Sequence, residues 1–255
     1  MEDLKKKFER LVCVMMELRD KCPWDQKQTI DSLRYLTLEE CYELSDTILE
    51  EDYNGIKEEL GDLLLHVIFY SIIATESKKF NLSDVISNQT NKLIQRHPHI
   101  YSNTKVKNEK DVKRNWELLK LKEKNKSSVL SGVPKSLPTM LKTYRIQEKV
   151  KGIGFDFPDS KTSFEKVFEE IKEFKNELDQ KNTEKATEEF GDVLFALIGF
   201  AQKVGINSLN ALEKTNNKFI ERFNKMENLI SRTQKKISDY SFEELDEFWQ
   251  KTKNY

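Results

Sequence analysis

The chain has 255 residues, and its 43 Lys and Arg against 44 Asp and Glu give a net charge of −1. This balance argues against a basic DNA-binding domain, although local groups of Lys and Arg can still hold phosphates. The three cysteines form no CxxC pair, no signal peptide is visible, and no apolar run reaches the roughly 18 residues of a membrane helix. We therefore expect a cytoplasmic protein with reduced thiols that binds neither membranes nor, stably, nucleic acid.

The first half of the chain is predicted to be helical. Apolar spacing predicts a helix over residues 4–19, which stops before Pro23 because proline cannot continue the hydrogen-bond ladder. Trp24 is either a core side chain or a platform on which a base stacks. Asp31 is the expected cap of the next helix, and Asn54-Gly55 is the expected turn after it. These and the later helices of this half are expected at about 31–51, 56–77, 83–96 and 111–124.

The second half repeats this order of helices after a linker expected at residues 122–131. Gly152 and Gly154 mark a break, but two glycines are too few for a phosphate loop. Either Asp159 or Ser160 can cap the helix that follows. No alternating strand pattern occurs, so we expect an all-α fold with domains at 1–125 and 126–255. The helices of this half are expected at 139–149, 159–178, 183–204, 207–232 and 241–251.

Four acids stand out in the second half. Residues three or four apart share a helix face, so Glu170 pairs with Glu173, and Glu189 pairs with Asp192. A helix rises about 1.5 Å per residue, so if the chain turns near Thr183, each pair of acids lies about 14 Å from that turn. Antiparallel helices about 8–10 Å apart then bring the pairs together. Such a cluster repels itself unless it binds a cation; the alternative is a set of ordinary solvated acids in a chain that is 34% charged.

The residues that follow Asp192 favour the cation. Residues 193–201 are apolar on every side, which predicts a buried helix, and acids that enter a buried helix need a partner. Ala196 and Gly199 continue the acidic face and are small enough to let a neighbouring helix come close.

The same cassette occurs twice, at a constant offset of 130 positions. A pair formed by Lys and Arg and a pair formed by Trp and Lys also recur. These repeats indicate a duplicated domain. In the first copy the repeated residues are Glu39, Glu40, Glu43, Glu59, Asp62, Lys92, Arg96, Trp116 and Lys120, and in the second they are Glu169, Glu170, Glu173, Glu189, Asp192, Lys218, Arg222, Trp249 and Lys253.

The ligand chemistry favours Mg²⁺, with Mn²⁺ possible, because carboxylates without His or Cys select a hard cation. A di-iron bundle would need Glu-x-x-His, which is absent. His66 follows Asp62 by four residues, but Ala196 takes its place in the second copy, so we favour a packing role. His97 and His99 have no Cys cluster to complete a zinc site.

A divalent cation beside Lys218, Arg222 and Lys253 suits a polyphosphate. An activated water, deprotonated with help from a cluster carboxylate, would attack phosphorus in line and cleave a phosphoanhydride. Trp249 could stack on a base. As alternatives, Lys218 and Arg222 pair only with nearby acids, and Trp249 anchors the last helix in the core.

The pattern Glu-Glu-x-x-Glu followed by Glu-x-x-Asp, with Cys-Pro-Trp-Asp and Arg-His-Pro-His, resembles the MazG family of all-α nucleoside triphosphate pyrophosphohydrolases. The resemblance spans the whole chain in the two-copy bacterial form. It implies tandem helical-bundle domains, a homodimer, and Mg²⁺-dependent hydrolysis of NTPs or dNTPs to a nucleoside monophosphate and pyrophosphate.

The resemblance also implies roles for particular residues. It implies hydrolysis mainly by the second copy, while the first copy either hydrolyses too or binds nucleotide as a regulatory module without turnover. A purely structural scaffold would leave the repeated acids unexplained. The implied metal ligands are Glu170, Glu173, Glu189 and Asp192, with Glu169 beside them as a further catalytic residue, and Glu40, Glu43, Glu59 and Asp62 in the first copy. The implied contacts to triphosphate and base are Lys218, Arg222, Trp249 and Lys253.

Overall fold

The computed structural model describes every residue except 124–127, 234 and 255. Within that part of the chain there are α-helices and short 3-10 helices and no strand, which confirms the all-α prediction. The chain forms two compact units, Met1–Val106 and Lys107–Tyr255. The expected domain boundary at 125/126 lies outside the described residues.

No single described helix is long and apolar enough to cross a membrane; one pair of helices with a 106° bend, Thr183–Lys203 and Ser208–Ile230, passes that test by length and composition.

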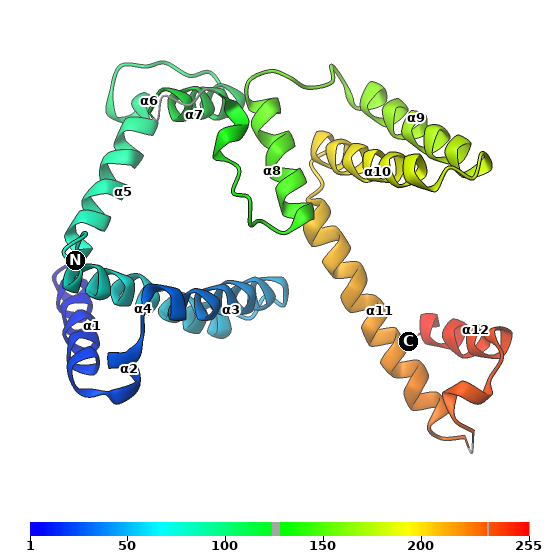
Figure 1. Ribbon diagram of the computed structural model, residues 1–255, viewed down its shortest axis with the longest axis horizontal. Helices are drawn as coiled ribbons and strands as arrows, with labels where there is room; N and C mark the ends of the chain where they lie inside the picture. Colours follow the sequence, from blue (N-terminus) through cyan, green and yellow to red (C-terminus); the bar gives the residue numbers. More distant parts are fainter. Residues whose placement is uncertain (124–127, 234, 255) are drawn as a thin grey trace. The chain divides into compact units, whose positions relative to one another are not determined.

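The first unit is organised around a helical hairpin. Helices α3 and α4 pack side by side along most of their length, and α1 packs across the end of α4 (Figure 1). Its core consists of Met15, Leu33, Ile68, Phe69 and Ile73. The helices of this unit are α1 (Glu2–Lys21), α2 (Pro23–Lys27), α3 (Ile30–Leu49), α4 (Tyr53–Glu76), α5 (Leu82–Arg96) and α6 (Pro98–Tyr101).

Two expected helix boundaries in this unit were wrong. The cap of α3 is Thr29 rather than Asp31, because Thr29 and Ser32 form a reciprocal capping box. Asn54-Gly55 lies inside the first turn of α4, and the chain reverses instead at Glu51, whose φ is 58°. Gly55 has a packing role, since an added Cβ would lie 2.6 Å from Cγ2 of Thr47.

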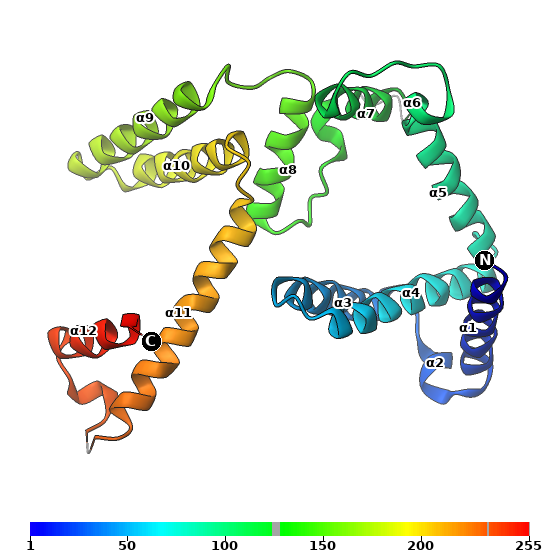
Figure 2. The same cartoon turned by 180° about the vertical axis from the view of Figure 1, so that it is seen from behind.

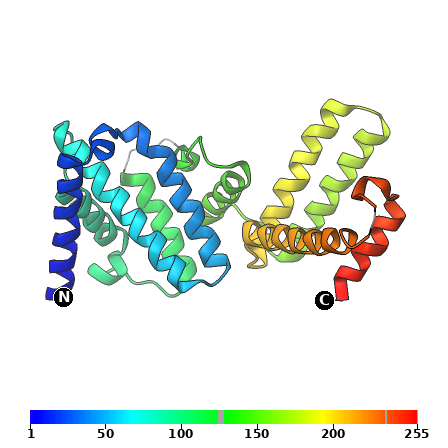
Figure 3. The ribbon, with the colours of Figure 1, turned by 90° about the horizontal axis from the view of Figure 1, so that it is seen from below.

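The second unit contains a similar hairpin of α9 and α10 (Figure 2). Its turn lies at Lys181, with a φ of 57°, and Asn182 caps α10, as expected for a turn near Thr183. Helix α8 packs on α10, and α12 folds back on α11 (Figure 3). The helices of this unit are α7 (Glu109–Glu123), η1 (Val129–Gly132), α8 (Thr139–Gly152), α9 (Ser160–Asp179), α10 (Thr183–Lys203), α11 (Ser208–Ile230), η2 (Ile237–Asp239), α12 (Phe242–Lys251) and η3 (Thr252–Asn254).

Helix α10 is not buried all round, so that prediction was wrong for the single chain. Val193 and Ile198 are buried, but Leu194, Phe195 and Leu197 are 47%, 43% and 43% exposed. Among the described elements, α9 is the main partner of α10 and α8 covers a smaller part of it, so a large fraction of these side chains stays exposed. Helix α4 has the same kind of apolar stripe, formed by Leu60, Leu64 and Val67, at 53%, 39% and 44% exposure.

Candidate active site

The second copy brings three of its predicted acids together. One carboxylate oxygen each from Glu170 and Glu173 on α9 and Glu189 on α10 lie within 4.8 Å of one another. Glu170 is buried, and Asp192 lies close enough for its charge to act on Glu189. Burial and the charges of Glu173 and Asp192 raise the pKa of Glu189. The carboxylates of this cluster therefore repel one another, and a bound cation would relieve that repulsion.

The first copy repeats this arrangement. Oxygens of Glu40 and Glu43 on α3 and Glu59 on α4 also lie within 4.8 Å of one another. Burial and the charge of Asp62 raise the pKa of Glu40, and burial and the charge of Glu43 raise that of Glu59. Oε2 of Glu59 is buried with no hydrogen-bond partner among the described residues. Both clusters offer only carboxylate oxygens, the donor set of a hard divalent cation.

Lys166 is a residue of this site that the sequence analysis missed. Its Nζ lies 2.7 Å from Oε1 of Glu170 and 2.8 Å from Oε1 of Glu169, and these bonds raise the pKa of the ammonium. Lys166 precedes Glu170 by four residues, so helix periodicity alone would have placed it on the same face. The corresponding residue in the first copy is Leu36.

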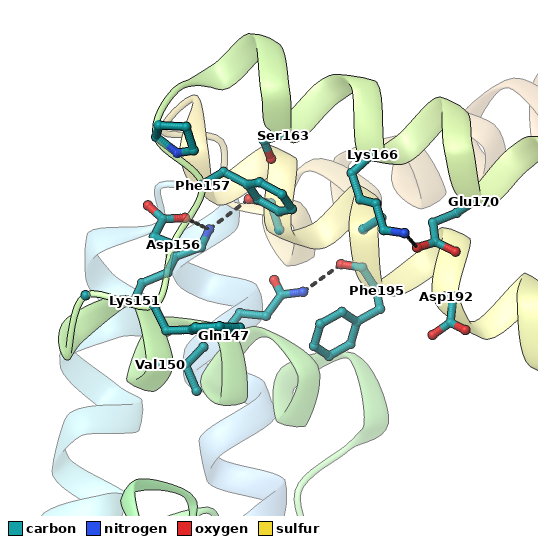
Figure 4. Close-up of a pocket in the computed structure, with 15 residues that line it drawn as sticks. Gln147, Val150, Lys151, Asp156, Phe157, Ser163, Lys166, Glu170, Asp192 and Phe195 are labelled. Carbon is teal, nitrogen blue, oxygen red and sulfur yellow. Dashed lines mark hydrogen bonds and ion pairs between the residues drawn. The ribbon is translucent and has the colours of Figure 1, made fainter.

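A cavity of about 440 Å³ lies beside the second cluster, between α8, α9 and α10. Figure 4 shows Glu170 and Asp192 at one end of it and Asp156 at the other. Asp156 is held by Nζ of Lys203 at 2.8 Å and lies 3.9 Å from Nζ of Lys151. The wall between these polar ends is mostly apolar and includes Val150, Phe155, Phe157, Pro158, Phe195 and Ala196.

The close approach of α8 to α10 occurs where small residues were expected to allow it. Nε2 of Gln147 donates to the carbonyl of Phe195 at 2.6 Å, and Nζ of Lys151 donates to the carbonyl of Gly199 at 2.8 Å. A Cβ added to Gly199 would lie 3.2 Å from both terminal atoms of the Gln147 amide. Gln147 is 5% exposed, and its Oε1 is buried with no partner among the described residues.

The predicted substrate-binding residues lie elsewhere in the second unit. The Arg222 guanidinium carbon lies 4.0 Å from the centroid of the Trp249 ring, and its Nη2 donates to the Trp249 carbonyl at 3.3 Å. Lys218 and Lys253 are exposed. None of the four lines the cavity, and the length of α11 that carries Arg222 runs away from the α9–α10 hairpin (Figure 1). One chain alone therefore does not bring these residues to the acids.

Their counterparts on α7 have a different environment. Nζ of Lys120 lies 5.5 Å from the centroid of the Trp116 ring and 3.0 Å from Oε1 of Glu117. Glu117 also accepts from Lys149 of α8 at 3.1 Å. Burial alone would raise the pKa of Glu117. The hydrogen bonds from Lys120 and Lys149 outweigh burial, so the pKa of Glu117 is lowered. Lys149 thus links α8 to α7 through Glu117, Lys120 contacts the same carboxylate from within α7, and Lys253 faces solvent.

The structure also decides among the remaining interpretations. Trp24 is 56% exposed, so the core role was wrong and the stacking role stays a prediction. His66 is buried, its Nδ1 lies 2.8 Å from Oγ1 of Thr37, and burial lowers its pKa, which agrees with a packing role. His97 and His99 belong to no metal-binding group among the described residues, where both such groups consist of carboxylates alone.

Comparison with known proteins gave matches in both copies and alignments along nearly the whole chain. The sequence profile of the MazG nucleotide pyrophosphohydrolase domain matches residues 28–101 and 159–226, one match in each copy. The nucleoside triphosphate pyrophosphohydrolase/pyrophosphatase MazG of Thermotoga maritima is 40% identical, with 96% of this chain and 95% of that protein aligned. The nucleoside triphosphate pyrophosphohydrolase of Escherichia coli K12 is 36% identical, with 96% and 97% aligned. YabN of Bacillus subtilis, which is uncharacterized, is 41% identical over 96% of this chain and 51% of its own length.

Proposed function

Because the chain belongs to the MazG nucleotide pyrophosphohydrolase family, we propose that it hydrolyses NTPs or dNTPs to a nucleoside monophosphate and pyrophosphate. The reaction would depend on Mg²⁺, with Mn²⁺ as a substitute, and would take place mainly in the second copy. The observation that carries this proposal is the cluster of Glu170, Glu173 and Glu189, with oxygens within 4.8 Å, at one end of a cavity. The free thiols of Cys13, Cys22 and Cys41 support a cytoplasmic location.

The residues present fit a hard cation. Glu170, Glu173, Glu189 and Asp192 would hold it, because oxygens of the first three lie within 4.8 Å of one another and the pKa of Glu189 is raised by burial and by the charges of Glu173 and Asp192. A bound divalent cation supplies a Lewis acid that neutralises phosphate charge and lowers the pKa of a water. The corresponding ligands of the first copy are Glu40, Glu43, Glu59 and Asp62.

The chain's own groups would do the rest of the chemistry. A carboxylate at the edge of the cluster accepts a proton from the attacking water, and Glu169, which is exposed, is placed for this role beside Lys166. The Lys166 ammonium lines the cavity together with Glu170, and on substrate binding it would move from Glu170 to a phosphate oxygen. The apolar wall keeps bulk water away from the phosphorus.

We further propose a homodimer. Leu194 and Leu197, one turn apart on α10, are 47% and 43% exposed, and a second copy of the chain would cover them. A partner protomer would also supply to this site the residues that lie away from it within one chain. In this arrangement Lys218, Arg222 and Lys253 contact the triphosphate, and Trp249 holds the Arg222 guanidinium in place.

The first copy supports a second candidate role, as a nucleotide-binding or regulatory module without turnover. Its acids converge as closely as those of the second copy. However, no lysine corresponds to Lys166, and the pair formed by Trp116 and Lys120 is engaged with Glu117. These differences support unequal activity of the two copies.

The test is pyrophosphate release from a panel of NTPs and dNTPs with Mg²⁺, comparing Glu173→Gln with Glu43→Gln. The two substitutions are matched, because each removes one charge at the same position of the repeat. We expect Glu173→Gln to lose most of the activity and Glu43→Gln to keep most of it. Equal losses would contradict the division between the copies, and a wild-type protein that releases no pyrophosphate would contradict the activity itself.

A further inference from the structure

Helix α8 is held on two opposite faces. Gln147 and Lys151, four residues apart, reach α10, where they donate to the carbonyls of Phe195 at 2.6 Å and Gly199 at 2.8 Å. Lys149 is two residues from each of them, so with 3.6 residues per turn it lies on the opposite face of the helix. There it reaches α7, and α8 therefore lies between α7 and α10.

The contact with α7 is a group of charges around Glu117. Oxygens of this carboxylate lie 3.1 Å from Nζ of Lys149, 3.0 Å from Nζ of Lys120 and 3.6 Å from Nη2 of Arg145. Glu117 and Lys149 are buried, whereas the side chains of Lys120 and Arg145 are 22% and 31% exposed. Water can therefore solvate the latter two cations, but among the described residues the buried ammonium of Lys149 has Glu117 as its partner.

Glu117 also packs on the end of α8. A Cβ added to Gly152, the last residue of this helix, would lie only 3.0 Å from Cγ of Glu117. The turn that begins after Gly152 carries Phe155, Asp156 and Phe157 to the wall of the cavity. Glu117 thus holds the point of the chain from which this part of the wall starts.

Much of the cavity wall depends on the position of α8. Gln147, Val150 and Lys151 of this helix line the cavity, and so does the turn of residues 154–158 (Figure 4). The acids of the second cluster stand instead on α9 and α10, which pack directly on each other. A displacement of α8 would therefore change the cavity and leave the acids together.

The helix that corresponds to α7 in the repeat has no such contact. Trp116 and Trp249 are equivalent at an offset of 133 positions, so Glu117 corresponds to Gln250 of α12. Gln250 is exposed, its Nε2 donates to Asp246 of the same helix at 3.0 Å, and α12 packs on α11. Of these two equivalent helices, the one that packs on α8 has a buried carboxylate at this position.

We propose that Glu117 and Lys149 are positioning residues for the second site, which hold α8, and with it the wall of the cavity, where the substrate can bind. The inference rests on the proposed function, since it takes this cavity as part of the substrate site of the second copy. It also makes α7, which by the repeat ends the first copy, a component of the second site.

The first experiment is Glu117→Gln in the full-length protein. It leaves the ammonium of Lys149 buried without a counterion, and α8 has to shift to bring that charge to water. We expect the KM for an NTP to rise about tenfold, while kcat and the Kd for Mn²⁺ stay within about threefold, because the acids do not depend on α8. In hydrogen exchange, the amides of α8 should exchange faster and those of α9 should not change.

Three further variants distinguish positioning from a simple loss of charge. Glu148→Gln is the matched control, because Glu148 is on α8 but pairs with Arg145 of the same helix, with its own side chain 50% exposed. It should leave the KM unchanged. The double variant Glu117→Leu/Lys149→Met replaces the buried ion pair by apolar side chains and should restore the KM to within about threefold of the wild type. Lys149→Met alone leaves Glu117 with Lys120 and Arg145, so its KM should lie between those of Glu117→Gln and the double variant.

The outcomes separate this inference from the proposed function. If the wild-type protein hydrolyses NTPs and Glu117→Gln keeps the wild-type KM, the inference is wrong and the proposed function stands. A parallel loss of affinity for Mn²⁺ would also overturn it, since the damage would then extend to the acids. If Glu117→Gln does not fold, equal KM values for Lys149→Met and the double variant refute the inference. A wild-type protein that releases no pyrophosphate contradicts the proposed function, and the inference fails with it.

Discussion

Replacement of Lys166 by methionine should strengthen cation binding at the second cluster before any nucleotide is present. The ammonium lies 2.7 Å from Glu170 and 2.8 Å from Glu169, so an entering cation has to displace it from Glu170 or share that carboxylate. Hydrogen bonds between charged groups contribute about 1.5–3 kcal/mol. The bond to the half-exposed Glu169 contributes less, and Lys166 itself is 35% exposed. The free energy by which Lys166 opposes cation binding is therefore about 1–2 kcal/mol. This corresponds to a fall of about five- to thirtyfold in the Kd for Mn²⁺.

Calorimetric titration of Mn²⁺ in a Glu43→Gln background measures this effect at the second cluster, because the first cluster is then impaired. Lys161→Met is the matched control. It removes the same charge from the same helix, but Lys161 pairs with Glu165, at 3.9 Å, with both side chains largely exposed, and lies near Asp159 rather than the acid cluster. We expect a change below about twofold for the control. A folded Lys166→Met protein whose Kd for Mn²⁺ equals or exceeds that of the wild type would refute the idea that this lysine competes with the cation.

Three further predictions concern the metal, the assembly and the stability of the first unit. Chelation with EDTA should abolish pyrophosphate release, and Mg²⁺ or Mn²⁺ should restore it; activity that persists in EDTA would exclude the metal mechanism. Leu197→Glu should lower the mass measured by light scattering from that of a dimer to that of a monomer, whereas an unchanged mass would place the interface elsewhere. The hydrogen bond from Arg19, at 2.8 Å, lowers the pKa of Glu76 below its ordinary 4.5, so its stabilising contribution is complete above that pH and is lost as the pH falls through the folded-state value. Glu76→Gln should therefore lower the urea midpoint more at pH 7 than at pH 3, and an equal loss at both would show that the charge is not responsible.

The helices and the acids could be predicted because they depend on local rules. Residues 3 or 4 apart share a face, so the pairs on α9 and α10 followed from spacing, and the repeat at 130 positions carried them to α3 and α4. The last long helix, predicted at 241–251, was placed within one residue, since α12 begins at Phe242 and Ser241 caps it. The cap of α3 was misplaced because Thr29 and Asp31 are both good caps, and only the extended backbone after α2 selects the former.

The cavity and the surroundings of the substrate residues could not be predicted, because they depend on which helices meet. The side chain of Gln147 reaches α10 because α8 crosses α10 near Gly199. The spacing of apolar residues along α8 does not specify where that crossing occurs. The prediction that α10 is buried assumed that its partners lie in the same chain. Within the chain Leu194 and Leu197 stay 47% and 43% exposed, and the proposed dimer would cover them.

The acid clusters and the cavity occupy separate positions on the helices, and this separation lets two copies with the same acids differ in structure beside them. The acids meet where α9 and α10 run side by side, and the equivalent acids meet in the same way between α3 and α4, so the cluster needs only the hairpin. The cavity needs a third helix, α8, and small side chains one and two turns along from Asp192. Substitutions at Ala196 and Gly199 can therefore close the cavity without moving a carboxylate. In the first copy these positions are taken by His66 and Phe69, which are buried in the core, and the acids of that copy still lie together.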